Sequence, residues 1–294
     1  MDVVLKSKEP TVKVPYFGQQ SRFFEFFDKV ISPLMDGDGI YAETNSGSNG
    51  NAFVFAEKGY KVIINDVGEY SNSIAKAILS DEKPIIINEL SPNWLNDYKN
   101  TYIERASVYA ALMDIYGYNA IIPRQLEARV KMNIDKYILQ LERLNQKNIR
   151  AYKIFQMELF DYLKLLKKEN IVVDVLFMDF AWPWRDGSKT EEYNNTANLL
   201  SNIFQNTNNK IEIWDKTNIL EKVIDAVNNA RKVSKYVLLS NQSSNFPDSE
   251  ILEVELLKNG IEFIRHTMLT DAEYEDNLGK VNFFREYVYV IKGD

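Results

Sequence analysis

The sequence places a carboxylate and aromatic rings directly after one of its most apolar segments. Residues 172–178 read VVDVLFM, and Asp179, Phe180, Ala181 and Trp182 follow at once. A short, largely β-branched apolar run predicts a strand buried in a parallel sheet. Ligands of open α/β sheets bind beyond the carboxyl ends of the strands, so these side chains suit a flat ligand with polar edges, such as a base. A turn aspartate with core tryptophans is the open alternative.

A second group of candidate residues surrounds a glycine-bearing loop. The pattern predicts a strand, a loop, a helix and a second strand at residues 39–43, 44–51, 52–58 and 61–65. Gly47 allows the backbone to approach a ligand closely, and Asp66, about 20 residues further on, can accept hydrogen bonds from both hydroxyls of a ribose. The loop lacks the G-x-G-x-x-G pattern, so an ordinary turn between strand and helix is the alternative.

The charges of this region indicate which nucleotide-like ligand it suits. Glu43 begins the loop and Asp66 follows the next strand, so two acids stand at adjacent strand ends. Such a site disfavours phosphates and accepts a cation. S-adenosylmethionine, an adenosine that carries a sulfonium and an ammonium group, therefore fits better than NAD or ATP.

Composition excludes several other kinds of chemistry. The chain has 294 residues, 45% of them hydrophobic and 26% charged, which is typical of a globular protein. It contains no cysteine and one histidine, His266, so we expect no disulfide, no thiolate catalysis and no metal site. The sequence shows neither a signal-peptide pattern nor an apolar run near the ~20 residues of a membrane span, and we expect a cytoplasmic protein.

Residues 89–170 differ in character from the rest of the chain. Their pattern is mostly helical, and residues 124–168 carry eleven Lys or Arg against five Asp or Glu in a chain of net charge −7. Tyrosines are interleaved at positions 102, 109, 116, 118, 137 and 152. A basic helical insert with tyrosines suits DNA contacts, whereas solvated lysine faces on a helical cap are the alternative.

The remaining segments complete an α/β pattern. Phenylalanines at helical spacing predict a helix near residues 23–31, and further helices are predicted at 195–205 and 218–232. A buried strand follows at 235–242. The last 44 residues, from 251 to 294, predict a helix and two antiparallel strands.

Together these segments resemble the Dam-like, or alpha-group, DNA adenine-N6 methyltransferases over nearly the whole chain. KVPYFG, with Lys13, Pro15, Tyr16 and Gly18, looks like the family's K-x-P-[YF]-x-G-G-K segment. YAETNSGSNG looks like the E-P-F-x-G-x-G cofactor loop, IIND like the acidic ribose motif, and REYVYVIKG like the C-terminal strand. The catalytic D-P-P-Y motif corresponds to Asp179 through Trp182, with both prolines replaced.

The resemblance implies a fold, a cofactor and a partner. The expected fold is α/β: a Rossmann-like S-adenosylmethionine-dependent methyltransferase fold, with a mostly parallel sheet and helices on both faces. Residues 1–88 and 171–294 would form the catalytic domain, and 89–170 a helical target-recognition insert that binds double-stranded DNA through Arg124, Arg129 and Lys131. The implied cofactor contacts are Tyr16, Gly18, Glu43, Gly47, Asn49, Asp66, Glu158 and Asp179.

The implied reaction is methylation of the N6 amine of adenine. Asp179 would accept one N–H of this amine and the backbone carbonyl of Phe180 the other, while Trp182 stacks on the flipped base. Positioning and electrostatics would supply most of the rate enhancement. Replacement of the prolines by Phe180 and Ala181 leaves two alternatives open: a non-catalytic DNA-binding homologue, and a methyltransferase for another amine or base.

Overall fold

The computed structural model describes residues 23–82, 93–98, 100–116, 127–183, 214–275 and 281–294. The predicted helix at 195–205 and the N-terminal residues up to 22 lie outside these ranges.

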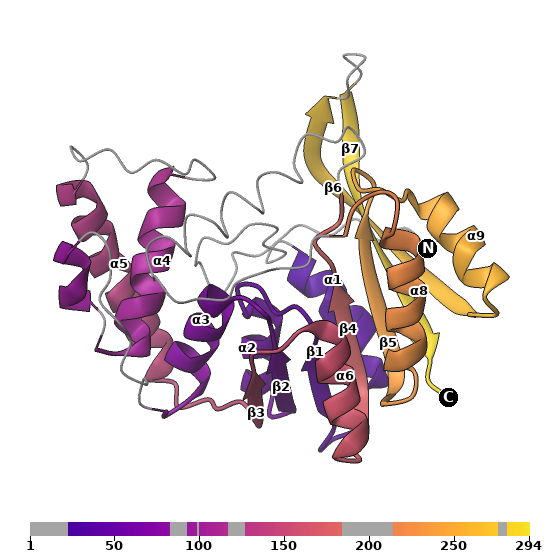
Figure 1. The fold of residues 1–294 in the computed structure, drawn as a ribbon, viewed down its shortest axis with the longest axis horizontal. Coiled ribbons are helices and arrows are strands. Elements are labelled where there is room, and N and C mark those ends of the chain that lie inside the picture. Colours follow the sequence, from indigo (N-terminus) through magenta and orange to yellow (C-terminus); the bar gives the residue numbers. More distant parts are fainter. Residues whose placement is uncertain (1–22, 83–92, 99, 117–126, 184–213, 276–280) are drawn as a thin grey trace.

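A seven-stranded sheet forms the centre of the described chain (Figure 1). Its strands are β1 (Ile40–Glu43), β2 (Lys61–Asn65), β3 (Lys153–Phe155), β4 (Val173–Asp179), β5 (Ser234–Gln242), β6 (Phe263–Glu275) and β7 (Val281–Lys292). The spatial order is β3-β2-β1-β4-β5-β7-β6. Strands β1 to β5 are parallel, and β7 runs antiparallel between β5 and β6.

Helices cover both faces of this sheet. One apolar cluster joins it to α1 (Phe24–Ile31), α2 (Gly50–Glu57) and α3 (Glu69–Leu79). A second cluster joins the opposite face to α6 (Leu159–Lys168), α8 (Ile219–Ala230) and α9 (Ser249–Lys258). The expected Rossmann-like α/β architecture, a mostly parallel sheet with helices on both faces, is therefore confirmed.

The order in which strands are added to the sheet changes side between β1 and β4. Strands β2 and β3 lie on one side of β1, whereas β4 and β5 lie on the other. In open α/β sheets this switch point leaves a crevice at the carboxyl ends of the strands, which is where ligands bind. The loops that follow β1, β2, β3 and β4 are therefore the ones that can build a site.

The expected insert at 89–170 is too long, because β3 and α6 lie inside it and belong to the sheet and its covering layer. A three-residue strand such as β3 is too short for a periodic pattern to reveal. The described remainder consists of a 3₁₀ turn (Asn93–Tyr98), α4 (Tyr102–Tyr116) and α5 (Glu127–Asn145). Helix α4 packs against α3 and α5, at the end of the molecule away from β6 and β7 (Figure 1).

Three tyrosines of this segment belong to the core. Tyr102, Tyr109 and Tyr137 are 7%, 0% and 3% exposed and lie in the same apolar cluster as α3. They therefore stabilise the packing of α3, α4 and α5, and cannot contact a nucleic acid as the sequence pattern suggested. Tyr152 is exposed.

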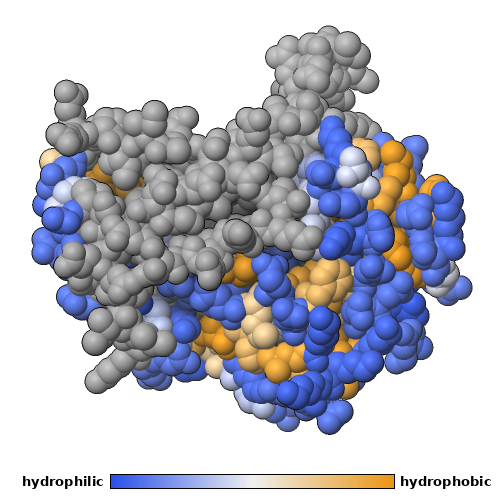
Figure 2. Space-filling view, viewed as in Figure 1, coloured by the Kyte–Doolittle hydropathy of each residue, from blue (hydrophilic) through white to orange (hydrophobic). Residues whose placement is uncertain are grey.

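On the face drawn in Figure 2, hydrophilic residues of the described part predominate, with apolar residues visible between them. Within the described ranges, every helix is too short or too polar to cross a membrane.

Candidate functional site

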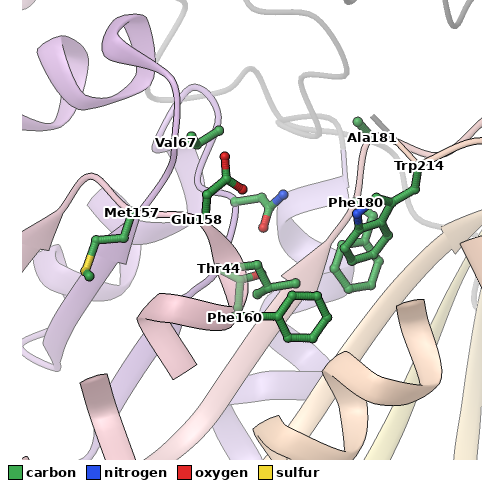
Figure 3. Close-up of a pocket in the computed structure, with 10 residues that line it drawn as sticks. Thr44, Val67, Met157, Glu158, Phe160, Phe180, Ala181 and Trp214 are labelled. Atoms are coloured by element: carbon green, nitrogen blue, oxygen red, sulfur yellow. The ribbon is translucent and has the colours of Figure 1, made fainter. Parts of the chain in front are cut away.

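A pocket opens at the carboxyl ends of β1 to β4. It encloses about 560 Å³ of empty space, open solvent at its mouth included. Its lining residues follow four strands and one later loop: Thr44, Asn45, Val67, Met157, Glu158, Leu159, Phe160, Phe180, Ala181 and Trp214. Figure 3 shows the rings of Phe180 and Trp214 on one side and Glu158 and Val67 on the other. The pocket thus has two aromatic rings, tilted by 44° to each other, opposite a carboxylate.

The side chain of Asn65 holds two of these loops together. Its amide nitrogen donates to the backbone oxygens of Thr44 at 3.0 Å and Met157 at 3.1 Å, and its amide oxygen accepts from the Met157 nitrogen at 3.1 Å. Asn65 is 1% exposed, so these bonds form in a dry environment. The last residue of β2 therefore fixes the pocket walls that follow β1 and β3.

The loop after β1 contains two residues in the left-handed region. Gly47 has φ = 53° and Asn49 has φ = 61°. Asparagine adopts this conformation more readily than other residues with a Cβ, so it can stand where the cofactor loop that the sequence resembles has glycine. The Asn49 side chain is fully buried and donates to the Ser71 backbone oxygen at 2.8 Å. It thereby anchors the loop to α3.

Asp66 joins the loops after β1 and β2. Its two carboxylate oxygens accept from the backbone nitrogens of Gly47 at 2.9 Å and Gly68 at 2.8 Å. A Cβ at residue 68 would meet Asp66 Oδ1 at 3.1 Å, so a glycine there allows this close approach. Burial raises the pKa of Asp66, while the bonds from Gly68, Gly47 and Ser71 act in the opposite direction.

Glu43 is the buried acid of the site. It is 2% exposed, and the Tyr41 hydroxyl donates to its Oε1 at 2.7 Å. Burial raises the pKa of Glu43 to about 7, hydrogen bonds from Tyr41 and Ser46 lower it, and Asp66 raises it further. The carboxyl group therefore changes charge near neutral pH.

The end of β4 does not present all three predicted catalytic residues in the same way. Asp179 is half-buried and Phe180 lines the pocket. Trp182 is 4% exposed, and its indole nitrogen donates to the Ser240 backbone oxygen at 3.0 Å. The Phe180 carbonyl, expected to accept from a substrate amine, already accepts from the Trp182 backbone nitrogen at 2.9 Å.

The aromatic ring beside Phe180 in the pocket is Trp214. The two ring centroids are 4.8 Å apart, and Phe160 lies 6.2 Å from Trp214. No motif in the sequence singles out Trp214, which is separated from β4 by more than 30 residues. Trp214 precedes α8 in the sequence, and only the fold brings it to the pocket.

Glu158, which the resemblance places near a ring of the cofactor, lines the pocket. It is exposed and stands at the N-cap position of α6, where its side chain makes no capping bond. Glu43, Gly47, Asn49, Asp66, Glu158 and Asp179 thus all lie in or beside the loops at this sheet edge. The other two predicted cofactor contacts, Tyr16 and Gly18, lie outside the described residues.

The predicted DNA contacts differ in their availability. Arg124 lies outside the described residues. Arg129 is exposed on the first turns of α5. Lys131 forms an ion pair with Glu127 at 2.7 Å and lies 5.3 Å from the centroid of the Trp94 ring.

Ion pairs offset much of the positive charge of residues 124–168. Four of these pairs use acids outside that range: Lys136 with Asp114, Lys147 with Glu57, Arg150 with Asp81 and Lys153 with Glu169. Within the described ranges, no cluster of three or more His, Cys, Asp or Glu side chains could hold a metal ion.

Comparison with known proteins gives similarity at the level of structure. No protein-family model matches the chain, and no curated protein does. A precorrin 8W decarboxylase from Methanobacterium thermoautotrophicum is 9% identical to this chain. The match covers 98% of this chain and 96% of that chain, with a TM-score of 0.40. A SAM-dependent methyltransferase from Agrobacterium tumefaciens is 8% identical to this chain. The match covers 92% of this chain and 61% of that chain, with a TM-score of 0.46.

A third solved structure is magnesium protoporphyrin IX methyltransferase from Synechocystis with bound SAM. The identity is 10%, the match covers 92% of this chain and 79% of that chain, and the TM-score is 0.39. Similarity this low assigns neither cofactor nor substrate, which have to be argued from the residues of this chain.

Proposed function

We propose that this protein binds S-adenosylmethionine in the pocket and methylates the N6 amine of adenine in double-stranded DNA. The observation that supports this proposal best is the pocket itself. It lies at the switch point of the sheet and combines the Phe180 and Trp214 rings with the carboxylate of Glu158. The two rings can contact the adenine of the cofactor from one side of the pocket, and the carboxylate can accept from its exocyclic amine.

The charges of the site favour a cationic cofactor over one with phosphates. The lining of this pocket contains an acid and, among the described residues, neither lysine nor arginine. Glu43 and Asp66 lie behind the adjoining loops. A phosphate would be repelled by these carboxylates, whereas a sulfonium and an ammonium group are attracted to Glu43.

The side chains at the end of β4 suit the acceptor amine. Bound S-adenosylmethionine would supply an electrophilic methyl group. Asp179, half-buried at the sheet edge, would accept one N–H of the substrate amine and orient its lone pair. The Phe180 carbonyl has two lone pairs, so it can accept the second N–H beside the bond from Trp182. Trp182 is buried against β5, so it would not stack on the base as the sequence pattern suggested.

Calorimetric titration with S-adenosylmethionine tests the cofactor assignment. Glu158→Gln keeps the shape of the side chain and removes its charge, so we expect affinity to fall about tenfold through loss of a charge-assisted hydrogen bond. Glu169→Gln, at the opposite end of α6, is the matched control and should bind as the wild type does. Absence of binding to the wild-type protein would refute the proposal. Asp66 is less suitable for this test because its carboxylate supports two loops.

Transfer of labelled methyl groups to unmethylated plasmid DNA tests the substrate assignment. We expect methylated adenine in the digested product, and at least a hundredfold lower rate for Asp179→Ala. Label found in another base would keep the methyltransferase and correct the target.

A DNA-binding homologue without activity is the second candidate. The observation that favours it is Trp182, whose indole is buried in the core beside β5 and is not available to a flipped base. Binding of cofactor and DNA without any transfer, on plasmids of varied sequence, would establish this alternative.

A further inference from the structure

Two loops at the carboxyl edge of the sheet are joined by a hydrogen bond between their main chains. The described part of the loop after β4 consists of residues 180–183, and the loop after β5 consists of residues 243–248. The backbone nitrogen of Phe246 donates to the backbone oxygen of Pro183 at 2.7 Å. The ring of Phe246 also packs against the apolar cluster of α6, α8 and α9. The loop after β5 therefore holds the loop that carries the proposed acceptor site.

The side chain of Asn241 fixes the loop after β5 on both sides of Phe246. Asn241, the penultimate residue of β5, is fully buried. Its amide oxygen accepts from the side-chain nitrogen of Asn245 at 3.0 Å and from the backbone nitrogen of Gln242 at 2.8 Å. Its amide nitrogen donates to the backbone oxygen of Pro247 at 3.1 Å. The residues before and after Phe246 are thus both held, which fixes the direction of the Phe246 amide.

Ser240 holds the loop after β4 at a second point. Its backbone oxygen accepts from the indole nitrogen of Trp182 at 3.0 Å, and its hydroxyl donates to Glu286 Oε1 at 2.6 Å. Ser240 is also the residue of β5 that pairs with Asp179 of β4. The end of β5 and the loop after it therefore hold the loop after β4 at two successive residues, Trp182 and Pro183.

These bonds bear on the direction of the Phe180 carbonyl. Aromatic contacts hold the Phe180 side chain, whereas its carbonyl accepts from the Trp182 backbone nitrogen and so follows the position of residues 182 and 183. We propose that Asn241 is a positioning residue of the acceptor site. It acts through the bond between Phe246 and Pro183, because a buried side chain with three hydrogen bonds has few alternative positions. This inference rests on the proposed methyl transfer, in which the Phe180 carbonyl accepts from the substrate amine.

Hydrogen exchange and single-turnover kinetics on plasmid DNA test the role of Asn241. Asn241→Ala removes three hydrogen bonds, and Asn245→Ala, a milder change, removes one. In Asn241→Ala the Phe246 amide should exchange about tenfold faster or more, because its exchange requires the bond to Pro183 to open. The rate of methyl transfer should fall about tenfold or more, because a small misplacement of the acceptor groups is costly. The affinity for S-adenosylmethionine should change by less than about threefold, and Asn245→Ala should show smaller changes in exchange and rate.

Asn145→Ala is the matched control. Asn145 is half-buried on α5, and its side-chain nitrogen donates to the backbone oxygen of Ala77 at 2.8 Å, near the end of α3 that is remote from the pocket. This variant should keep the wild-type exchange at Phe246 and the wild-type transfer rate. With an active wild type, unchanged exchange or an unchanged rate in Asn241→Ala would overturn the inference, as would a loss of cofactor affinity as large as the loss of rate. A wild-type protein that binds the cofactor and transfers no methyl group would overturn the proposed function together with this role.

Discussion

Replacement of Glu43 by glutamine should separate cofactor binding from stability. Glu43 is 2% exposed and burial raises its pKa to about 7. A sulfonium or ammonium group nearby is stabilised only by the ionised carboxylate. Binding of S-adenosylmethionine should therefore release a proton from Glu43 and strengthen as the pH rises through about 7.

The expected magnitude follows from the ionised fraction. With a pKa of about 7, roughly a tenth of Glu43 is ionised near pH 6 and roughly nine tenths near pH 8. If only the ionised form binds, the wild-type dissociation constant should be about ten times higher near pH 6 than near pH 8. Glu43→Gln should bind more weakly near pH 8 and lose this component of the pH dependence.

Isothermal titration at about pH 6, 7 and 8 measures the effect. The amino group of the cofactor titrates in the same experiment, so the ratio of wild-type to Glu43→Gln affinity at each pH is the quantity to compare. S-adenosylhomocysteine, which has no sulfonium charge, serves as a second control and should give a smaller change. A ratio that stays constant across this range would refute the role of Glu43.

The same carboxyl group destabilises the free protein at higher pH. Because its pKa is raised from 4.5 to about 7 in the folded state, the folded protein binds more protons than the unfolded chain in this range. The contribution of Glu43 to the free energy of unfolding is therefore largest below its unfolded pKa of about 4.5 and falls as the pH rises to about 7, by up to about 3 kcal/mol. Glu43→Gln should unfold at a higher temperature than the wild type near pH 8, a gain that calorimetry without ligand would measure.

Three further predictions concern the pocket, the loop and the helical segment. Trp214→Leu should weaken S-adenosylmethionine binding about tenfold in titrations. Trp182→Leu should lower the free energy of unfolding by about 2–4 kcal/mol and leave the affinity for S-adenosylmethionine unchanged. The reverse pattern would contradict the assignment of Trp214 to the pocket. In urea unfolding, Asn49→Ala should lower the free energy of unfolding by about 2 kcal/mol, and Asn49→Gly should lower it less, because the position needs φ = 61°. Equal decreases for the two variants would argue against backbone strain in Asn49→Ala. Arg129→Ala should reduce the salt dependence of DNA binding by about one counterion, and Lys131→Ala by less because its charge is already paired; equal slopes would show that the ion pair opens on binding.

Much of the sheet could be predicted because its strands are short buried runs with clear boundaries. Strands β1, β2 and β4 begin and end within one residue of the predicted ranges. Strand β3 was missed because three residues give no period, and its absence extended the predicted insert to residue 170. The sequence pattern therefore indicates a strand only where several successive residues are buried in the sheet.

Side-chain direction at the strand ends could not be predicted in the same way. Asp66 was chosen as a candidate because it directly follows a predicted strand, whereas Glu158 was chosen through the family resemblance alone. Trp182 was assigned to the ligand because it is aromatic and close to Asp179. The turn in which its backbone nitrogen donates to the Phe180 carbonyl instead directs the indole toward β5.

The departures from the motifs that the sequence resembles therefore differ in their consequences. Asn49 stands at a position with φ = 61°, where the resembled motif has glycine, and its side chain forms a bond to α3 that glycine cannot make. At Phe180 and Ala181, where the resembled motif has prolines, there is no equivalent backbone restraint. What holds that loop is packing: Phe180 lies between Trp182 and Trp214, at 5.4 and 4.8 Å between ring centroids. A catalytic loop fixed by aromatic contacts rather than by prolines should be sensitive to Trp214, which contacts both the loop and the pocket.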